Sequence, residues 1–232
     1  MLGVFANPIC VIIGAIVGVL LKGGIPERVR MILMQGIGLC VLLIGISGAV
    51  ETANVMVVIL SMVAGSVTGE LLRIDDRLNA FGDWAQKKIA RPGDSSFGQG
   101  FVSATLLFCV GSMAVVGALE AGLNNDPTIL LAKTALDTVT SVVFASMLGI
   151  GVAFSAIPLL VYQGGMALLA GVLGPLMSEA LIAEMSAVGS LLILALGLNM
   201  LGLTNERPIR VGNLLPSIFM PIAMLPLVEW LF

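Results

Sequence analysis

The sequence has little charge and none of the side chains on which most enzyme chemistry depends. Only 11% of its 232 residues are Asp, Glu, Lys or Arg, and it contains no histidine. Soluble domains carry about 25% charged residues, so this chain lacks the polar surface that a water-soluble globule needs. The absence of histidine removes the commonest proton shuttle and metal ligand. We therefore expect neither a soluble protein nor an enzyme.

Motifs for cofactors and for nucleic acid are also absent. The chain has no phosphate-binding loop, no HExxH or GxSxG motif, and no acidic cluster with metal-ligand spacing. Cys10, Cys40 and Cys109 lie singly in apolar runs, where they are expected to act as small buried hydrophobes. No basic patch is interleaved with aromatic residues. The sequence predicts no cofactor, no metal site and no nucleic-acid partner.

Long apolar runs dominate the chain. Apolar residues make up 58% of the sequence and the mean hydropathy is +1.10. A transmembrane helix needs about 20 consecutive apolar residues. Eight such candidate spans occur, at about 3–21, 31–50, 54–72, 99–121, 128–148, 151–173, 186–203 and 212–231. The pattern predicts an all-α, polytopic transmembrane helix bundle forming a single domain over residues 1–232.

The basic residues predict the orientation of these spans. The breaks at 22–30, 73–98 and 207–210 hold 3, 5 and 2 Lys or Arg, which is 10 of the 11 in the chain. The alternate breaks, which this topology places on the opposite side of the membrane, hold no Lys or Arg. Because Lys and Arg concentrate in cytoplasmic loops, we expect these three breaks in the cytoplasm and both termini outside. The loop at about 73–98 is the longest, and its middle could form an amphipathic interfacial helix.

A weak internal repeat accompanies this topology. At a constant offset of 151 residues, six identical pairs run from Gly14 and Gly165 to Asn54 and Asn205. This offset pairs spans 1–3 with spans 6–8, which the predicted topology places in opposite orientations. Inverted repeats of this kind, often with broken helices, recur in secondary transporters. We therefore predict an inverted repeat, although Gly- and Leu-rich segments match readily by chance.

The span at 128–148 carries an ion pair at membrane depth. Lys133 and Asp137 are four residues apart, so they share one helix face and can pair. Thr138 and Ser141 lie near this face, whereas Leu136 and Val139 cover the other side. Ionisable groups inside a membrane are costly and usually functional. Two interpretations stay open: the pair lines a pathway or substrate pocket, or it only ties helices together.

Further polar groups occur where helices are expected to break. Gln163 follows a stretch with Gly149, Gly151 and Pro158, and Ser217 lies in a span with three prolines. Proline removes a helical donor and leaves carbonyls that need partners other than lipid. The complete set of candidate substrate- or ion-binding residues is Lys133, Asp137, Thr138, Ser141, Gln163, Asn199, Asn213 and Ser217. Simple kinks are the alternative, and Asn7 beside Pro8 is a further polar point with the same ambiguity.

These features favour a small transporter or channel for a solute or ion. Its site is predicted near the middle of the membrane, around Lys133 and Asp137. The alternative is a non-transporting scaffold, sensor or assembly component, for which the 73–98 loop would be the docking surface. Two small-residue motifs, Gly14-xxx-Gly18 and Gly65-xxx-Gly69, suit close helix packing within the chain or in a homo-oligomer.

Five segments also resemble a known family. They are 3–7 (GVFAN), 108–120 (FCVGSMAVVGALE), 133–137 (KTALD), 144–158 (FASMLGIGVAFSAIP) and the stretch from Asn199 through 207–213 (RPIRVGN). Together they resemble the YdfK/YqgA-like family of bacterial inner-membrane proteins over essentially the whole chain. The family is catalogued as a domain of unknown function. The resemblance implies a multi-pass protein of the bacterial inner membrane, is compatible with transport, and supplies no substrate or assigned site.

Overall fold

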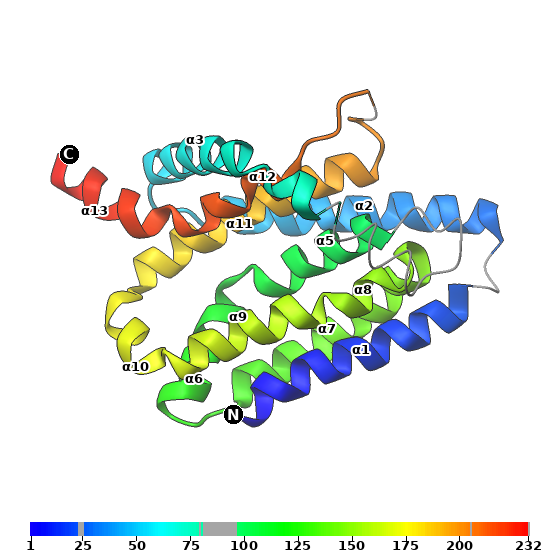
Figure 1. The fold of residues 1–232 in the computed structure, drawn as a ribbon, viewed down its shortest axis with the longest axis horizontal. Coiled ribbons are helices and arrows are strands. Elements are labelled where there is room, and N and C mark those ends of the chain that lie inside the picture. Colours follow the sequence, from blue (N-terminus) through cyan, green and yellow to red (C-terminus); the bar gives the residue numbers. More distant parts are fainter. Residues whose placement is uncertain (23–25, 79, 81–96, 205, 232) are drawn as a thin grey trace. The chain divides into compact units, whose positions relative to one another are not determined.

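Helices dominate the computed structural model, which describes residues 1–22, 26–78, 80, 97–204 and 206–231. They are α1 (Leu2–Lys22), α2 (Glu27–Ala49), α3 (Val55–Leu72), α5 (Phe97–Cys109), α6 (Ser112–Leu123), α7 (Thr128–Leu148), α8 (Gly151–Phe154), α9 (Ala156–Leu168), α10 (Ala170–Leu173), η1 (Gly174–Leu176), α11 (Glu179–Met200), α12 (Val211–Leu214), η2 (Leu215–Phe219) and α13 (Pro221–Leu231). The described residues contain no strand (Figure 1). Among the described residues, six segments are long and apolar enough to cross a membrane, or eight if each of two bent pairs is one span. The predicted all-α bundle is confirmed.

Two spans are broken by sharp bends. The predicted span at 99–121 is divided into α5 and α6, which meet at 62°. Gly111 makes this break, because its φ of 113° is readily adopted by glycine and strained for other residues. The last span bends by 56° between η2 and α13, beside the predicted proline breaks. By contrast, residues 151–168 form one candidate span, although Gly149, Gly151 and Pro158 suggested a break there.

The start of α11 differs from the sequence-based boundary. The helix begins at Glu179, earlier than the predicted start at 186. Ser178 is its N-cap, and its side chain accepts a hydrogen bond from the Leu181 amide at 3.2 Å. The apolar pattern missed these first two turns because Glu179 and Glu184 interrupt it. Glu184 is nevertheless buried, with 1% of its surface exposed.

Contacts between Cα atoms divide the chain into two compact units. The first comprises Met1–Met31 and Asn79–Leu176, and the second comprises Ile32–Leu78 and Met177–Phe232. Each unit thus combines segments that are distant in the sequence. The middle of the 73–98 loop, with its predicted interfacial helix, lies outside the described residues. The inverted repeat predicted between spans 1–3 and 6–8 is not confirmed and stays a prediction.

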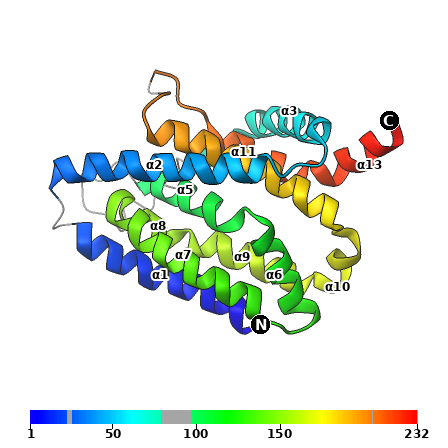
Figure 2. The same ribbon diagram turned by 180° about the vertical axis from the view of Figure 1, so that it is seen from behind.

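In the first unit, α1 and α7 run side by side in the same direction (Figures 1 and 2). Gly3 lies against Leu130, Gly14 against Ser141, and Gly18 against Ala145, so each contact joins residues 127 apart. A methyl group at Gly14 or Gly18 would overlap α7. Small residues therefore let the two helices approach closely, as the Gly14-xxx-Gly18 motif predicted. The core of this unit joins four helices through Val4, Ala121, Leu130 and Ala167.

In the second unit, glycines also mediate the closest helix contacts. Gly45 of α2 lies against Leu194 of the antiparallel α11. Gly65 and Gly69 of α3 lie against Ser217 and Asn213 of the broken last span. The second small-residue motif is therefore used within the chain. This packing holds α3 against α12 and the 3-10 helix η2, where a larger side chain would not fit.

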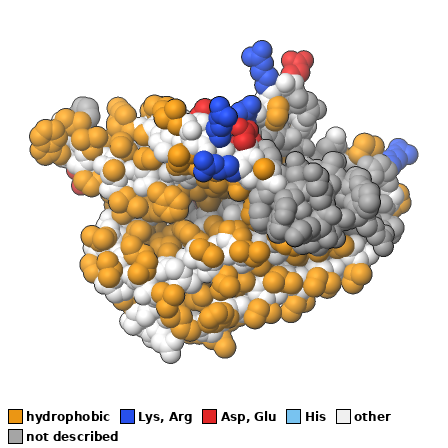
Figure 3. Space-filling view, in the orientation of Figure 1, with side chains coloured by type: hydrophobic (Ala, Val, Ile, Leu, Met, Phe, Trp, Pro, Cys, Tyr) orange, Lys and Arg blue, Asp and Glu red, His pale blue; other side chains and the backbone are white. Residues whose placement is uncertain are grey.

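The outward surfaces of both units are apolar. Side chains such as Leu43 of α2 and Val139 of α7 are exposed to 65% and 67%. Figure 3 shows hydrophobic side chains over most of the visible face, whereas charged side chains gather over α12 and the loop that precedes it. Exposed leucine and valine on long apolar helices are typical of surfaces that contact lipid.

Candidate functional site

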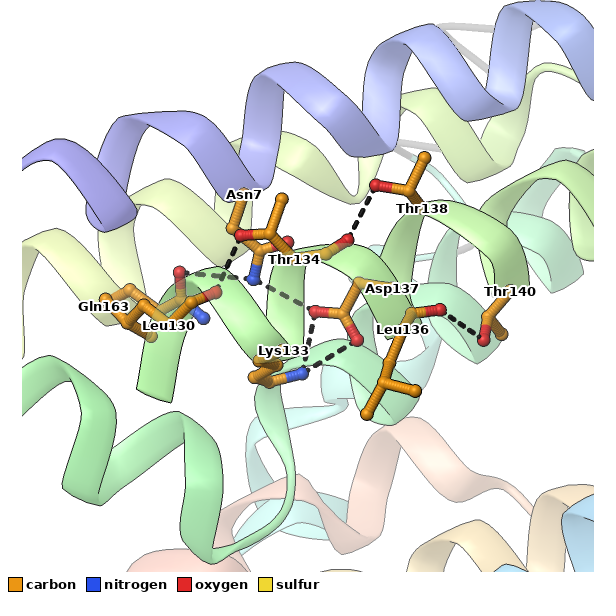
Figure 4. A network of polar contacts seen from close by, with 9 residues as sticks. All are labelled: Asn7, Leu130, Lys133, Thr134, Leu136, Asp137, Thr138, Thr140 and Gln163. Carbon is orange, nitrogen blue, oxygen red and sulfur yellow. Dashed lines mark hydrogen bonds and ion pairs between the residues drawn. The ribbon is translucent and has the colours of Figure 1, made fainter. Parts of the chain in front are cut away.

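The centre of the candidate site is the ion pair of α7. Lys133 Nζ donates hydrogen bonds to both carboxylate oxygens of Asp137, at 2.9 Å and 2.7 Å (Figure 4). Their side chains are 7% and 9% exposed, which confirms the predicted polar face of the helix. Leu136 and Val139 on the opposite face are exposed, as lipid-facing residues should be. The two charges therefore neutralise each other within an apolar helix.

Asn7 of α1 joins this pair from a neighbouring helix. Its side-chain amide Nδ2 donates to Asp137 Oδ2 at 2.9 Å. The side chain is short, so it reaches the carboxylate only because Gly3 and Gly14 bring α1 close to α7 above and below it. Asn7 is completely buried. The sequence marked Asn7 as a polar point but did not identify it as a partner of Asp137.

Gln163 of α9 contributes to the cluster from a third helix. Its Oε1 lies 3.5 Å from Asn7 Nδ2, at the limit of a hydrogen bond. Asn7 Oδ1 and Gln163 Nε2 are both buried without a hydrogen-bond partner within the described part of the chain. A buried polar group without a partner costs about 1–3 kcal/mol. The cluster thus retains one unused acceptor and one unused donor next to the ion pair.

These residues lie at a similar depth along their helices. Asn7 and Lys133 each lie five residues after the first residue of their helix, and Gln163 lies five residues before the last residue of α9. At 1.5 Å per residue, each of these residues lies about 7.5 Å from the named end of its helix. Asp137 is the tenth of 21 residues in α7, close to the middle of the span as predicted. The cluster therefore lies inside the apolar span, between its middle and one end.

The ends of α1 and α7 nearest the cluster lie together. The N-terminal amine of Met1 donates to Asn125 Oδ1 at 3.0 Å, and Asn125 belongs to the loop between α6 and α7. Asp126 in the same loop accepts hydrogen bonds from the amide and hydroxyl groups of Thr128, at 2.9 Å and 2.6 Å. These bonds lower the pKa of Asp126 below its ordinary value. The polar loop thus closes the end of the helix pair that carries the cluster.

The break between α5 and α6 lies near the ion pair. Cys109, the last residue of α5, is within electrostatic range of both Lys133 and Asp137. Beyond it, the amides of Gly111, Ser112 and Met113 lie outside a helical hydrogen-bond ladder, as the first amides of any helix do. Such amides can bind a negatively charged group. The site therefore combines two charges and two side-chain amides, and the break between α5 and α6 lies near it.

The hydroxyl groups predicted along α7 have local partners. Thr138 Oγ1 donates to the Thr134 carbonyl at 2.6 Å, and Ser141 Oγ donates to the Thr138 carbonyl at 2.8 Å. Ser141 also lies against Gly14 of α1. In this arrangement both hydroxyls stabilise the backbone, and neither is part of the hydrogen-bonded cluster around Asp137.

Three other predicted residues belong to the second unit. Asn199 Oδ1 accepts from the amide of Ile209 at 3.0 Å, and its Nδ2 donates to the Ile209 carbonyl at 2.8 Å. Asn213 donates to Glu70 Oε2 at 2.6 Å and accepts from the Asp75 amide at 2.7 Å. Ser217 Oγ is fully buried and has no hydrogen-bond partner among the described residues. Asn199 and Asn213 thus hold a loop and the start of α12 in place.

Comparison with known proteins identifies the family. The model for a protein of unknown function, DUF554, matches residues 2–225. This chain belongs to the DUF554 family. It is 35% identical over 227 residues to the uncharacterized protein YqgA of Escherichia coli strain K12, covering 96% of this chain and 95% of that protein.

A second relative carries a name that refers to the membrane. The chain is 34% identical over 225 residues to the uncharacterized membrane protein YdfK of Bacillus subtilis strain 168, covering 95% of this chain and 94% of that protein. No solved structure gives a significant match. The resemblance seen in the sequence is therefore confirmed. The chain shares its family with a membrane protein and has several helices that are long and apolar enough to cross a bilayer.

Proposed function

We propose that this protein carries a small polar solute or ion across the bacterial inner membrane, with its binding site at Asn7, Lys133, Asp137 and Gln163. The observation that carries the proposal is the buried ion pair joined by two side-chain amides that keep an unused acceptor and donor. Charged groups inside a membrane cost at least about 3 kcal/mol each, and usually mark a substrate or ion pathway.

The arrangement supports binding in preference to a purely structural role. An ion pair that only joined helices would be expected to pair residues from different helices. Here Lys133 and Asp137 are on the same helix, and the lysine makes no hydrogen bond to another helix among the described residues. The pair also keeps a small exposed surface, whereas Asn7 and Gln163 have none. A ligand would therefore approach from the side of the two charges.

The chemistry of binding follows from the ion pair. A cation or proton that binds Asp137 would take the place of the Lys133 ammonium group, and an anionic group that binds Lys133 would take the place of the carboxylate. In the first case Asn7 Nδ2 can keep its bond to Asp137 and hold that side chain in position. The proposal assigns these residues a binding role and no catalytic one.

Transport can be tested with the purified protein in liposomes. Proton flux is followed with a trapped pH dye, and uptake of radiolabelled sodium, potassium and a panel of amino acids and small carboxylic acids is measured in parallel. The wild type is compared with the double variant Lys133→Met/Asp137→Asn, which removes both charges without leaving one unpaired. Arg207→Gln, an exposed residue of a loop, is the matched control for loss of a charge.

We expect flux of at least one probe that the double variant abolishes and that Arg207→Gln retains. A folded double variant that transports every probe at the wild-type rate would contradict the assigned site. Absence of any flux from the folded wild type over the whole panel would contradict the transport proposal itself.

A further inference from the structure

A surface groove lies in the second unit, far along the chain from the proposed transport site. Its volume is about 460 Å³. The last two turns of α3 form one wall, and the segment from Ile209 to Leu214 forms the other. The groove is lined mainly by apolar side chains, with one acidic and one basic group: Val67, Leu71, Ile209 and Leu214, with Glu70 and Arg210. It has the size of a site for a small molecule or a lipid headgroup.

The acidic group of this groove is held in a fixed position. Glu70 Oε2 accepts a hydrogen bond from Asn213 Nδ2 at 2.6 Å, and Asn213 is itself bound by the Asp75 amide. Gly69 lies directly against Asn213, which fixes the distance between the two walls. The other carboxylate oxygen, Oε1, has no such bond to Asn213. It faces Arg210.

The basic group lies close to the acidic one without a hydrogen bond between them. Arg210 Nη1 is 3.6 Å from Glu70 Oε1, and the two side chains are 59% and 63% exposed. This separation exceeds the length of a good N–H···O bond, so both groups keep bonding capacity for another molecule. The groove thus presents a positive and a negative charge side by side at its mouth.

The position of Glu70 suits the boundary between lipid tails and headgroups. It lies fifteen residues after Val55, the first residue of α3, and two residues before the last. At 1.5 Å per residue that places it about 3 Å from the end of a helix about 27 Å long, close to the roughly 30 Å thickness of the hydrocarbon core. Val67 and Leu71 on the same wall are 55% and 79% exposed, so the groove opens onto an apolar surface.

We propose that this groove binds a phospholipid whose headgroup carries a primary amine, such as phosphatidylethanolamine. Arg210 binds the phosphate, because a guanidinium group matches phosphate oxygens. Glu70 Oε1 accepts hydrogen bonds from the ammonium group. An acyl chain lies along Val67 and Leu71.

The same groups disfavour the other common headgroups. A glycerol headgroup carries the same anionic phosphate but no positive charge to offset its repulsion by Glu70. A choline headgroup has a positive charge but no N–H donor for Oε1. Discrimination should therefore depend on Glu70, whereas binding of any phospholipid should depend on Arg210.

The test is a lipid-binding measurement on the purified full chain. Native mass spectrometry records how much phosphatidylethanolamine, phosphatidylcholine and phosphatidylglycerol, all with identical acyl chains, remains bound. Because exposed ion pairs are worth up to about 1 kcal/mol, we expect about fivefold preference for the amine lipid in the wild type. Glu70→Gln, whose amide oxygen can still accept from Asn213, should remove this preference. Arg210→Gln should weaken binding of all three lipids by a similar factor.

Two exposed residues of the neighbouring loop provide matched controls. Glu206→Gln and Arg207→Gln remove the same charges outside the groove lining and should leave the lipid preference unchanged. Preferential binding of phosphatidylglycerol, or equal effects of the groove and control variants, would overturn the proposal. Because this measurement requires no flux, its outcome is separate from that of the transport assay.

Discussion

The side-chain amide of Asn7 donates a 2.9 Å hydrogen bond to the carboxylate of Asp137, which lies 130 residues later in the chain. Asp137 also accepts two bonds from Lys133. One buried carboxylate therefore depends on two donors from two helices. This relationship makes the stability of the first unit sensitive to each of the three residues.

Removal of one charge of the pair should destabilise the protein more than removal of both. Asp137→Asn strands the Lys133 charge in an apolar helix, and a stranded buried charge typically costs about 3–5 kcal/mol. The double variant Lys133→Met/Asp137→Asn leaves no unpaired charge, so its loss should be smaller. Reversible unfolding in detergent micelles gives the free energies of unfolding of the wild type, of Asp137→Asn and of the double variant. A double variant less stable than Asp137→Asn would contradict a paired role.

Asn7→Leu should lower the free energy of unfolding by about 1–3 kcal/mol, because Asp137 loses a buried donor. The apolar side chain has nearly the same size, so the change tests hydrogen bonding more than packing. The same unfolding measurement applies, with Leu2→Asn at the exposed helix start as a control for composition. An unchanged stability would show that the Asn7 bond contributes nothing.

Gly14→Ala should separate α1 from α7. The added methyl group would overlap Ser141 Oγ and the Thr138 carbonyl, and overpacking of this kind costs about 1–3 kcal/mol. Gly36→Ala in α2 is the matched control, because nothing lies within 4 Å of its added methyl group. The control should be neutral or slightly stabilising, since alanine favours helix over glycine. Equal melting temperatures for the two variants would count against the close α1–α7 contact.

Glu184→Ala should release the loop between α2 and α3. The carboxylate accepts from the amides of Ala53 and Asn54, both at 2.9 Å, and from the Thr52 hydroxyl at 2.6 Å. Hydrogen bonds to a charged group are worth about 1.5–3 kcal/mol. Hydrogen–deuterium exchange should become faster at Ala53 and Asn54, whereas the exposed control Glu51→Ala should leave it unchanged. Unaltered exchange in the Glu184 variant would show that Glu184 does not hold this loop in place.

Asp126 should add a pH-dependent contribution to stability. Its bonds from Thr128 lower its pKa in the folded protein below the ordinary value of 3.8. A group with a depressed pKa stabilises the fold above its unfolded pKa, and this contribution is lost as the pH falls through the folded pKa. The melting temperature of Asp126→Asn should therefore fall less than that of the wild type as the pH is lowered below about 4. An identical acid dependence in the variant would refute the contribution.

The sequence predicted local features well and long-range partners poorly. The start of α7 matches because Asn124, Asn125, Asp126 and Pro127 precede its apolar run, and its end matches because Gly149 follows it. The pairing of Lys133 with Asp137 also follows from their spacing on one helix. Asn7, by contrast, reaches Asp137 only through the packing of α1 on α7, which no local pattern encodes. An Asn-Pro step inside an apolar span was the one available signal.

The bends in the two broken spans also show what the sequence can and cannot predict. Three prolines indicated the bend in the last span, because each removes a backbone donor. The sharper bend at Gly111 was less visible, since glycine is common in this chain and tolerates both helical and left-handed backbone. Asn199 and Asn213 were predicted as candidate ligand-binding groups, and in the structure both bind backbone segments of the second unit. Sequence alone does not distinguish a polar side chain that binds its own loop from one that awaits a ligand.

The alignment of α1 with α7 also affects biosynthesis. At about 5–20 residues per second, α7 leaves the ribosome roughly 7 to 26 s after Asn7. During that interval the asparagine has no carboxylate to bind, and the glycine face of α1 has no helix to cover it. Because its partner in α7 is synthesised 130 residues later, an insertase or chaperone that shelters α1 would be expected to raise the yield of folded protein.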